Sequence, residues 1–216
     1  MKTKVLVADD QELFRDGVGM LIESQSDLEL VGSVGTGRDA VERVETMRPD
    51  VVLMDIRMPG LDGLAATELI LASGRDPLPR VLVVTTFRRD EAVVRAIRAG
   101  ASGFVTKDAD PEFLLAAIRT VAAGNSVIAP AATFDLLRQF GNSRPGPDAS
   151  VIDELSPREK EIFLLVAKGL SNAEVAESAF VEETTVKTHL GKILSKLGLR
   201  SRVQVVAFAW QHGLVG

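Results

Sequence analysis

Cysteine and tyrosine are absent from this 216-residue sequence, and it contains only one tryptophan and two histidines. Without cysteine, the chain cannot form disulfides, bind a metal through thiolates or use a thiol as a nucleophile. No apolar run is as long as a membrane-spanning helix needs, and the first residues lack the layout of a signal peptide. The sequence therefore predicts a soluble cytoplasmic protein with no membrane partner.

An overall positive charge is also missing. The formal net charge is -5 at pH 7, so the chain as a whole does not attract nucleic acid. Both histidines, His189 and His212, lie near the C-terminal end, which argues against a histidine kinase. The chain is 46% hydrophobic, which is enough to build one large domain or two small ones.

Three acidic residues follow two apolar runs in the first part of the chain. Residues 51–54 are typical of a buried strand that ends at Asp55, and residues 5–8 end in the same way at Asp9 and Asp10. Open α/β sheets bind their ligands at the carboxyl ends of strands, so these carboxylates are expected to converge. Converging carboxylates repel each other unless a proton or cation intervenes, and Mg²⁺ is the simplest such cation.

The first part of the chain alternates short apolar strands with amphipathic helices. Apolar strands covered by helices indicate a parallel sheet buried on both faces, and right-handed crossovers leave few topologies. We predict an α/β domain with a flavodoxin-like, doubly wound, five-stranded parallel sheet in the order 2-1-3-4-5. The predicted strands are residues 4–8, 28–34, 51–55, 80–85 and 103–106, and the predicted helices are residues 12–24, 37–47, 63–73, 89–99 and 111–123.

The pattern changes after this domain. A short helix is predicted at residues 131–140, and the next ten residues, GNSRPGPDAS, have the composition of a mobile linker. Only helical patterns follow. The predicted division is a first domain at residues 1–124, a linker with a short helix at 125–154 and a helical domain at 155–216.

Helix boundary signals divide the last part of the chain into four short helices. Ser156 and Ser171 each begin a capping box, and Gly169, Gly198 and Gly213 follow the helical patterns. Four capped helices in about sixty residues predict a small all-α domain that contains a helix-turn-helix.

The third of these helices, residues 183–197, combines an apolar face with a basic one. The apolar face repeats at helical spacing through Val186, Leu190, Ile193, Leu194 and Leu197. From residue 184 to the C-terminus there are five Lys or Arg and no Asp or Glu. This local charge suits DNA binding, but charge alone suits a solvated helix face equally well.

Two further strand ends supply side chains that can bind a phosphoryl group. Thr85 ends the fourth predicted strand, and Lys107 follows the fifth. Asp55 is therefore either a metal ligand only or also a nucleophile that forms an acyl phosphate. A hydrolase with an aspartyl intermediate is one alternative, although many such enzymes have a second Asp two residues later, where this chain has Arg57.

These motifs together resemble the receiver domain of bacterial two-component response regulators, which has a CheY-like fold. The resemblance covers about residues 1–124. The motifs that carry it are Asp9-Asp10, MDIRMPGLDG around Asp55, Thr85-Thr86 and GFVTKD, which contains Lys107.

The resemblance implies a role for each of these residues. Asp55 would accept a phosphoryl group from the phosphohistidine of a sensor histidine kinase, and Lys107 and Thr85 would bind its oxygens. Phe104 stands at the position of the family's switch aromatic, and Asp108 stands where many receivers have proline. The implied Mg²⁺ ligands are Asp9, partly through water, Asp10, Asp55 and the backbone carbonyl of Arg57.

Residues 155–202 resemble the LuxR-type helix-turn-helix, which implies that residues 183–197 form the recognition helix in the major groove. Gly191 is a departure, since relatives often have a polar or basic side chain there. It either permits close approach to the groove or gives up one base contact. The base-facing positions are Lys187, Thr188 and Gly191, and the other expected DNA contacts are Thr184, Lys192, Lys196, Ser171, Asn172 and Arg202.

The sequence thus predicts a transcription factor of the NarL/FixJ-like response regulator group. Its expected partners are a sensor histidine kinase and double-stranded DNA with an inverted-repeat operator, and phosphorylation is expected to promote a homodimer. It is not expected to be an enzyme beyond self-catalysed phosphotransfer and slow autodephosphorylation. The alternative is a DNA-binding regulator that does not depend on phosphorylation and uses its first domain as a dimerisation scaffold.

Overall fold

The structure is a computed structural model that describes residues 2–74, 76–86, 90–128 and 148–215. The chain divides into two compact units, residues 1–129 and 130–216, and each is treated separately below. The short helix predicted at residues 131–140 and most of the predicted linker lie outside the described residues. Within the described ranges, no helix has the length and apolar character needed to cross a membrane.

The first unit is built on a parallel sheet with the strand order β2-β1-β3-β4-β5-β6. The five predicted strands and their order are confirmed. A sixth strand, β6 (Val127–Ile128), pairs with β5 and extends the sheet beyond the predicted boundary at residue 124. The other strands are β1 (Thr3–Ala8), β2 (Leu28–Val34), β3 (Val51–Met54), β4 (Arg80–Thr85) and β5 (Gly103–Thr106).

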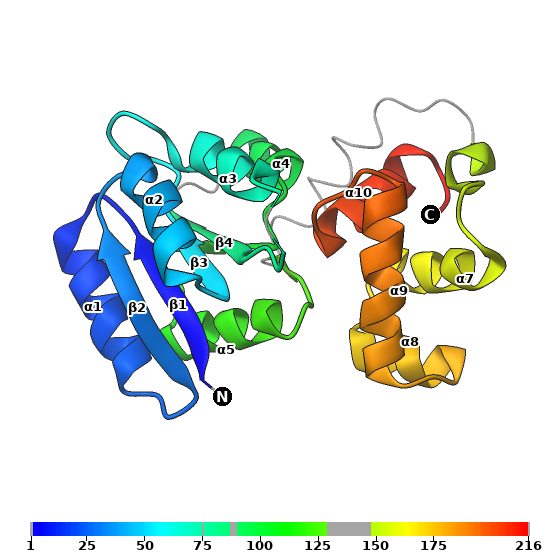
Figure 1. Cartoon of the computed structure of the whole chain (residues 1–216), viewed down its shortest axis with the longest axis horizontal. Helices are drawn as coiled ribbons and strands as arrows, with labels where there is room; N and C mark the ends of the chain where they lie inside the picture. Colours follow the sequence, from blue (N-terminus) through cyan, green and yellow to red (C-terminus); the bar gives the residue numbers. More distant parts are fainter. Residues whose placement is uncertain (1, 75, 87–89, 129–147, 216) are drawn as a thin grey trace. The chain divides into compact units, whose positions relative to one another are not determined.

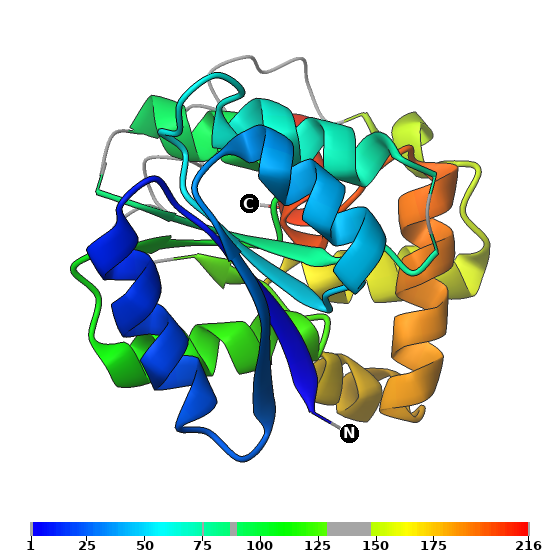
Figure 2. The ribbon, with the colours of Figure 1, turned by 60° about the vertical axis from the view of Figure 1, so that its left-hand side comes forward.

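Five helices cover the two faces of this sheet (Figures 1 and 2). One face lies against α1 and α5, and the other against α2, α3 and α4. The central strands β3 and β4 are buried because both faces are covered, which explains their apolar runs, whereas the edge strand β2 is only partly buried. The helices are α1 (Glu12–Glu23), α2 (Gly37–Met47), α3 (Gly63–Ala72), α4 (Asp90–Ala99) and α5 (Pro111–Ala122).

The strand register brings the chemically important residues to one edge of the sheet. Ala8 in β1 pairs with Met54 in β3, so the next residues, Asp9 and Asp55, leave the sheet side by side. The last pair of β4 and β5 joins Thr85 and Thr106, and Lys107 follows directly.

The second unit consists, in its described part, of a short 3-10 helix and four α-helices. Both predicted capping boxes are present, at the starts of α7 and α8. Ile152 and Leu155 belong to the core of this unit, and the backbone N–H of Asp148 donates to the carbonyl of His212. The unit therefore includes residues before the predicted start at 155. Its elements are η1 (Ala149–Ile152), α7 (Pro157–Ala167), α8 (Asn172–Ala179), α9 (Glu183–Lys196) and α10 (Arg202–Gln211).

Candidate functional site

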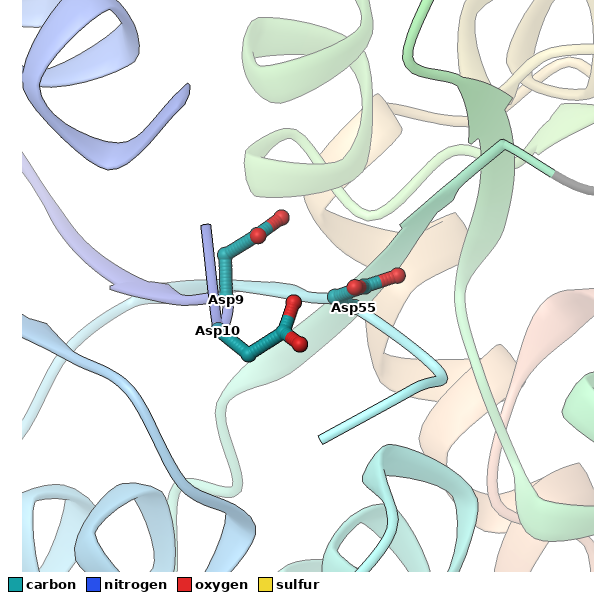
Figure 3. Close-up of side chains that lie close together, drawn as sticks. All are labelled: Asp9, Asp10 and Asp55. Atoms are coloured by element: carbon teal, nitrogen blue, oxygen red, sulfur yellow. The ribbon is translucent and has the colours of Figure 1, made fainter. Parts of the chain in front are cut away.

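The three predicted acidic residues gather beyond the ends of β1 and β3, as Figure 3 shows. Asp9 and Asp55 are buried, whereas Asp10 is exposed. One carboxylate oxygen from each of the three lies within 4.8 Å of the others. Asp9, Asp10 and Asp55 are called the acid cluster below. Because all its ligand atoms are carboxylate oxygens, the acid cluster could hold a hard divalent cation.

Lys107 places a single positive charge inside the acid cluster. Its Nζ lies 2.6 Å from Oδ2 of Asp9 and 3.1 Å from Oδ2 of Asp55, and its side chain is only 6% exposed. The ring of Phe14 lies on the ammonium group, with its centroid 4.8 Å from Nζ. One lysine cannot neutralise three carboxylates, so the acid cluster retains a net negative charge that suits a divalent cation.

Burial is the main influence on the charge state of Asp55. It raises the pKa of the Asp55 carboxyl above its ordinary value, and the hydrogen bond from Lys107 opposes this effect. The nearby charge of Asp9 raises the pKa further. Burial and the charge of Asp9 thus disfavour the negative charge on Asp55, and nearby cations such as Lys107 favour it.

Backbone hydrogen bonds fix the two buried carboxylates. Oδ1 of Asp9 accepts from the N–H of Gln11, and Oδ1 of Asp55 accepts from the N–H of Ile56. The loop then turns so tightly that a Cβ at Gly63 would overlap the carbonyl oxygen of Asp55. Sequence reasoning missed this role of Gly63 and the contact of Phe14, because both depend on distances in the folded unit.

The predicted switch residues occupy one face of the sheet. Paired residues of parallel strands point to the same side, and Thr85 pairs with Thr106 while Phe104 pairs with Val83. Thr85 and Phe104 are both buried there, whereas Val84 and Val105 belong to the core cluster on the side of α1 and α5. Thr85 and Phe104 are thus on the face covered by α3 and α4 (Figure 1).

The second unit presents a polar face on α9. Val186, Leu190 and Ile193 are buried in the core, which turns the opposite side of the helix to solvent. The residues exposed on that side include Thr184, Lys187, Thr188, Gly191 and Lys192, and they are called the outer face of α9 below. Their predicted role as DNA contacts is compatible with this exposure.

Lys196 is also exposed, but it is held within the unit. Its Nζ lies 2.7 Å from Oε2 of Glu159 on α7 and also donates to the carbonyl of Glu154. The hydrogen bond from Lys196 to Glu159, together with one from the N–H of Ser156, lowers the pKa of Glu159 to about 2. Lys196 therefore joins α9 to α7, and its predicted contact with DNA phosphate would require this pair to break.

The structure does not support two of the predicted DNA contacts. Asn172 and Arg202 are 1% and 6% exposed, and the guanidinium donates to Oδ1 of Asn172 over 2.8 Å and to the carbonyl of Leu170. Burial lowers the pKa of Arg202 to about 10. These side chains join α8 to α10 instead of facing DNA. Ser171 caps α8, where its hydroxyl accepts from the N–H of Glu174.

Two family models match the two units. The model described as "Response regulator receiver domain" matches residues 5–119, and the model described as "Bacterial regulatory proteins, luxR family" matches residues 153–209. The response regulator protein VraR of Staphylococcus aureus strain N315 is 38% identical over 217 residues, and the match covers all of both chains.

Solved structures agree with these matches. The response regulator ChrA of a haem-sensing two-component system is 33% identical with a TM-score of 0.53, and 99% of each chain is covered. The receiver domain of the response regulator NarL from Mycobacterium tuberculosis is 34% identical with a TM-score of 0.54, over 57% of this chain and 98% of that one. The chain therefore belongs to the response regulator family, as a two-component transcriptional regulator with an N-terminal receiver domain and a C-terminal LuxR-type DNA-binding domain.

Proposed function

We propose that Asp55 accepts a phosphoryl group from the phosphohistidine of a sensor kinase, and that this modification promotes a dimer that binds DNA in the cytoplasm. The observation that carries this proposal is the contact of Lys107 with both Asp9 and Asp55 at the end of the sheet. Two buried carboxylates, the exposed carboxylate of Asp10 and a buried ammonium group thus converge within a receiver domain.

Each residue of this group has a separate task in the transfer. One carboxylate oxygen of Asp55 forms the new P–O bond, while the P–N bond to the donor imidazole breaks and its electron pair stays with the imidazole. Lys107 supplies positive charge to the phosphoryl oxygens. The acid cluster and the backbone carbonyl of Arg57 would hold Mg²⁺, which would supply positive charge to offset the negative charge of the transferred group.

The phosphoryl group changes the charge balance at the sheet edge. The acyl phosphate carries about two negative charges where the Asp55 carboxylate carried one, so Lys107 gains a stronger partner than the carboxylates it now contacts. Thr85 moves toward the phosphoryl oxygens, and the ring of Phe104 follows into the space that the hydroxyl leaves. Both residues lie on the face of the sheet that α3 and α4 cover, so this rearrangement changes the surface that α4 presents to a partner.

The outer face of α9 then reads DNA. Lys187, Thr188 and Gly191 face bases in the major groove, while Thr184 and Lys192 contact the groove walls and phosphates. A dimer with two-fold symmetry places two such helices on an inverted-repeat operator.

The test is phosphorylation by acetyl phosphate with Mg²⁺, followed by intact-mass measurement and peptide mapping. We expect the mass of one phosphoryl group in the wild-type chain and none in Asp55→Asn. Asp16→Asn changes an exposed carboxylate on α1 and is the matched control, which should be labelled as well as the wild type. Labelling of Asp55→Asn equal to the control would place the acceptor elsewhere and refute the proposal.

A further inference from the structure

Gly191 is a helix-interior glycine that the fold does not require. Gly191 lies inside α9, with about two turns of the helix before it and about one after it, and it is exposed to solvent. Its φ is not among the positive values found at other glycines, and a Cβ built on it would meet nothing within 4 Å. Glycine destabilises a helix interior relative to alanine. Gly191 therefore lowers the stability of α9, and no contact within the unit requires a glycine at this position.

Several other glycines of the chain contrast with this one, whereas Gly17, which is exposed within α1, has the same free space around it. A Cβ at Gly37 or Gly63 would overlap a backbone carbonyl, and Gly169 and Gly198 have positive φ values of 88° and 64°. Each of them is explained by its own surroundings. No such overlap or positive φ explains Gly191, and its place on the outer face of α9, which Gly17 does not share, points to a partner outside the unit.

The place of Gly191 on the helix indicates what lies against it. It comes three residues after Thr188 and seven after Thr184, so the three share one side of α9, away from the buried Leu190. A threonine hydroxyl reaches only one bond beyond Cβ. A surface that these hydroxyls contact must lie close to the helix backbone, and a longer side chain at position 191 would hold that surface away.

We infer that Gly191 is a specificity-determining residue, the point where the backbone of α9 comes closest to the base edges of the major groove. This inference rests on the proposed use of the outer face of α9 for DNA. The longer side chains of Lys187 and Lys192 lie to either side of this point and reach outward, where the phosphates stand. The empty position lets the short Thr188 hydroxyl, which donates to the carbonyl of Thr184 within the helix, accept from the base edges, and it brings Thr184 close to the groove wall.

The alternative is that Gly191 merely lacks a contact that a longer side chain would make. Gly191→Ala and Gly191→Lys separate the two readings, because they give opposite results. Close approach predicts that alanine weakens specific binding about tenfold or more, and that lysine weakens it further despite its charge. A missing contact predicts unchanged binding with alanine and tighter binding with lysine, and either of these results would overturn the inference.

The measurement uses the full-length chain treated with beryllofluoride and Mg²⁺, and a duplex that the wild type selects from random-sequence DNA. Affinity is read by fluorescence anisotropy. Gly191→Ala should at the same time raise the melting temperature of the second unit by about 4 °C, which shows that weaker binding does not come from unfolding. A fall in melting temperature would contradict the claim that the fold has room for a side chain.

Ser178→Ala is the matched control in the same unit. Ser178 is exposed on α8, one turn after Glu174 on an acidic side of that helix, so it is unsuited to contact DNA. The alanine also favours helix, and it should leave the affinity unchanged. Failure of the wild type to select any DNA would refute the proposed function itself, whereas equal binding by wild type and Gly191→Ala would refute only the role of Gly191.

Discussion

Lys107→Met should destabilise the first unit strongly in the absence of divalent cations. Methionine keeps most of the side-chain volume against Phe14 but removes the charge that lies 2.6 Å from Asp9 and 3.1 Å from Asp55. Both carboxylates are buried, so solvent cannot replace the lost ammonium. Removing one partner of a buried ion pair costs about 3–5 kcal/mol, because a charge remains without compensation. We expect a loss of about that size.

The sole tryptophan makes the two units separable in the assay. Trp210 belongs to α10, so its fluorescence reports urea unfolding of the second unit, while far-UV circular dichroism reports both. In EDTA, Lys107→Met should lower the urea midpoint of the circular dichroism transition from the first unit and leave the fluorescence transition in place. Added Mg²⁺ should recover much of the loss, because a cation in the acid cluster replaces the missing charge.

Arg119→Met is the matched control for this prediction. Arg119 also binds a carboxylate, with Nε 2.7 Å from Oδ2 of Asp27, but the two side chains are 43% and 50% exposed. An exposed pair contributes much less to stability than a buried one, and Mg²⁺ should not restore its loss. This prediction fails if Lys107→Met loses no more stability than Arg119→Met, or if its loss is the same in EDTA and in Mg²⁺.

Three other changes test the local structure. Gly63→Ala should destabilise the first unit by about 3 kcal/mol and reduce labelling by acetyl phosphate, because the added Cβ would overlap the carbonyl of Asp55. An unchanged urea midpoint of the first unit would contradict this prediction. The second unit should lose stability as pH falls from 4.5 toward 2, because the pKa of Glu159 is about 2 in the folded unit and its ordinary value is 4.5. Glu159→Gln should lose less stability over this pH range, as measured by Trp210 fluorescence. Identical pH profiles for the variant and the wild type would show that Glu159 does not cause the loss. Arg202→Met should lower the melting temperature of the second unit, because Arg202 is buried. Lys192→Ala should leave the melting temperature unchanged and reduce the slope of DNA affinity against salt concentration by about one. A normal melting temperature and a reduced salt slope for Arg202→Met would instead place Arg202 in the DNA interface.

The order of the five main strands and the residues at their carboxyl ends could be predicted from the sequence. Strands such as β3 are buried on both faces, so their apolar runs stand out without an alignment, and strand ends in a parallel sheet must meet at one edge. The capping boxes at Ser156 and Ser171 are equally local signals. By contrast, β6 has two residues, and a strand that short has no periodicity of its own.

Polar residues in the second unit were harder to interpret. Asn172 and Arg202 are 30 positions apart, and Glu159 and Lys196 are 37 apart. Nothing in the local sequence distinguishes a lysine that binds a buried glutamate from one that faces DNA, because both lie on a helix with a basic side. Only the packing of α7 against α9 and of α8 against α10 shows which polar groups are already paired.

In the proposed function, phosphorylation of Asp55 controls the use of the outer face of α9 for DNA binding. The most direct test compares the affinity of wild type and Asp55→Asn for one selected duplex, before and after treatment with a phosphoryl donor and Mg²⁺. We expect treatment to raise the affinity of the wild type and to leave that of Asp55→Asn unchanged. Equal affinity of the wild type before and after treatment, with full phosphorylation confirmed by mass, would contradict it and favour a regulator that binds DNA without phosphorylation.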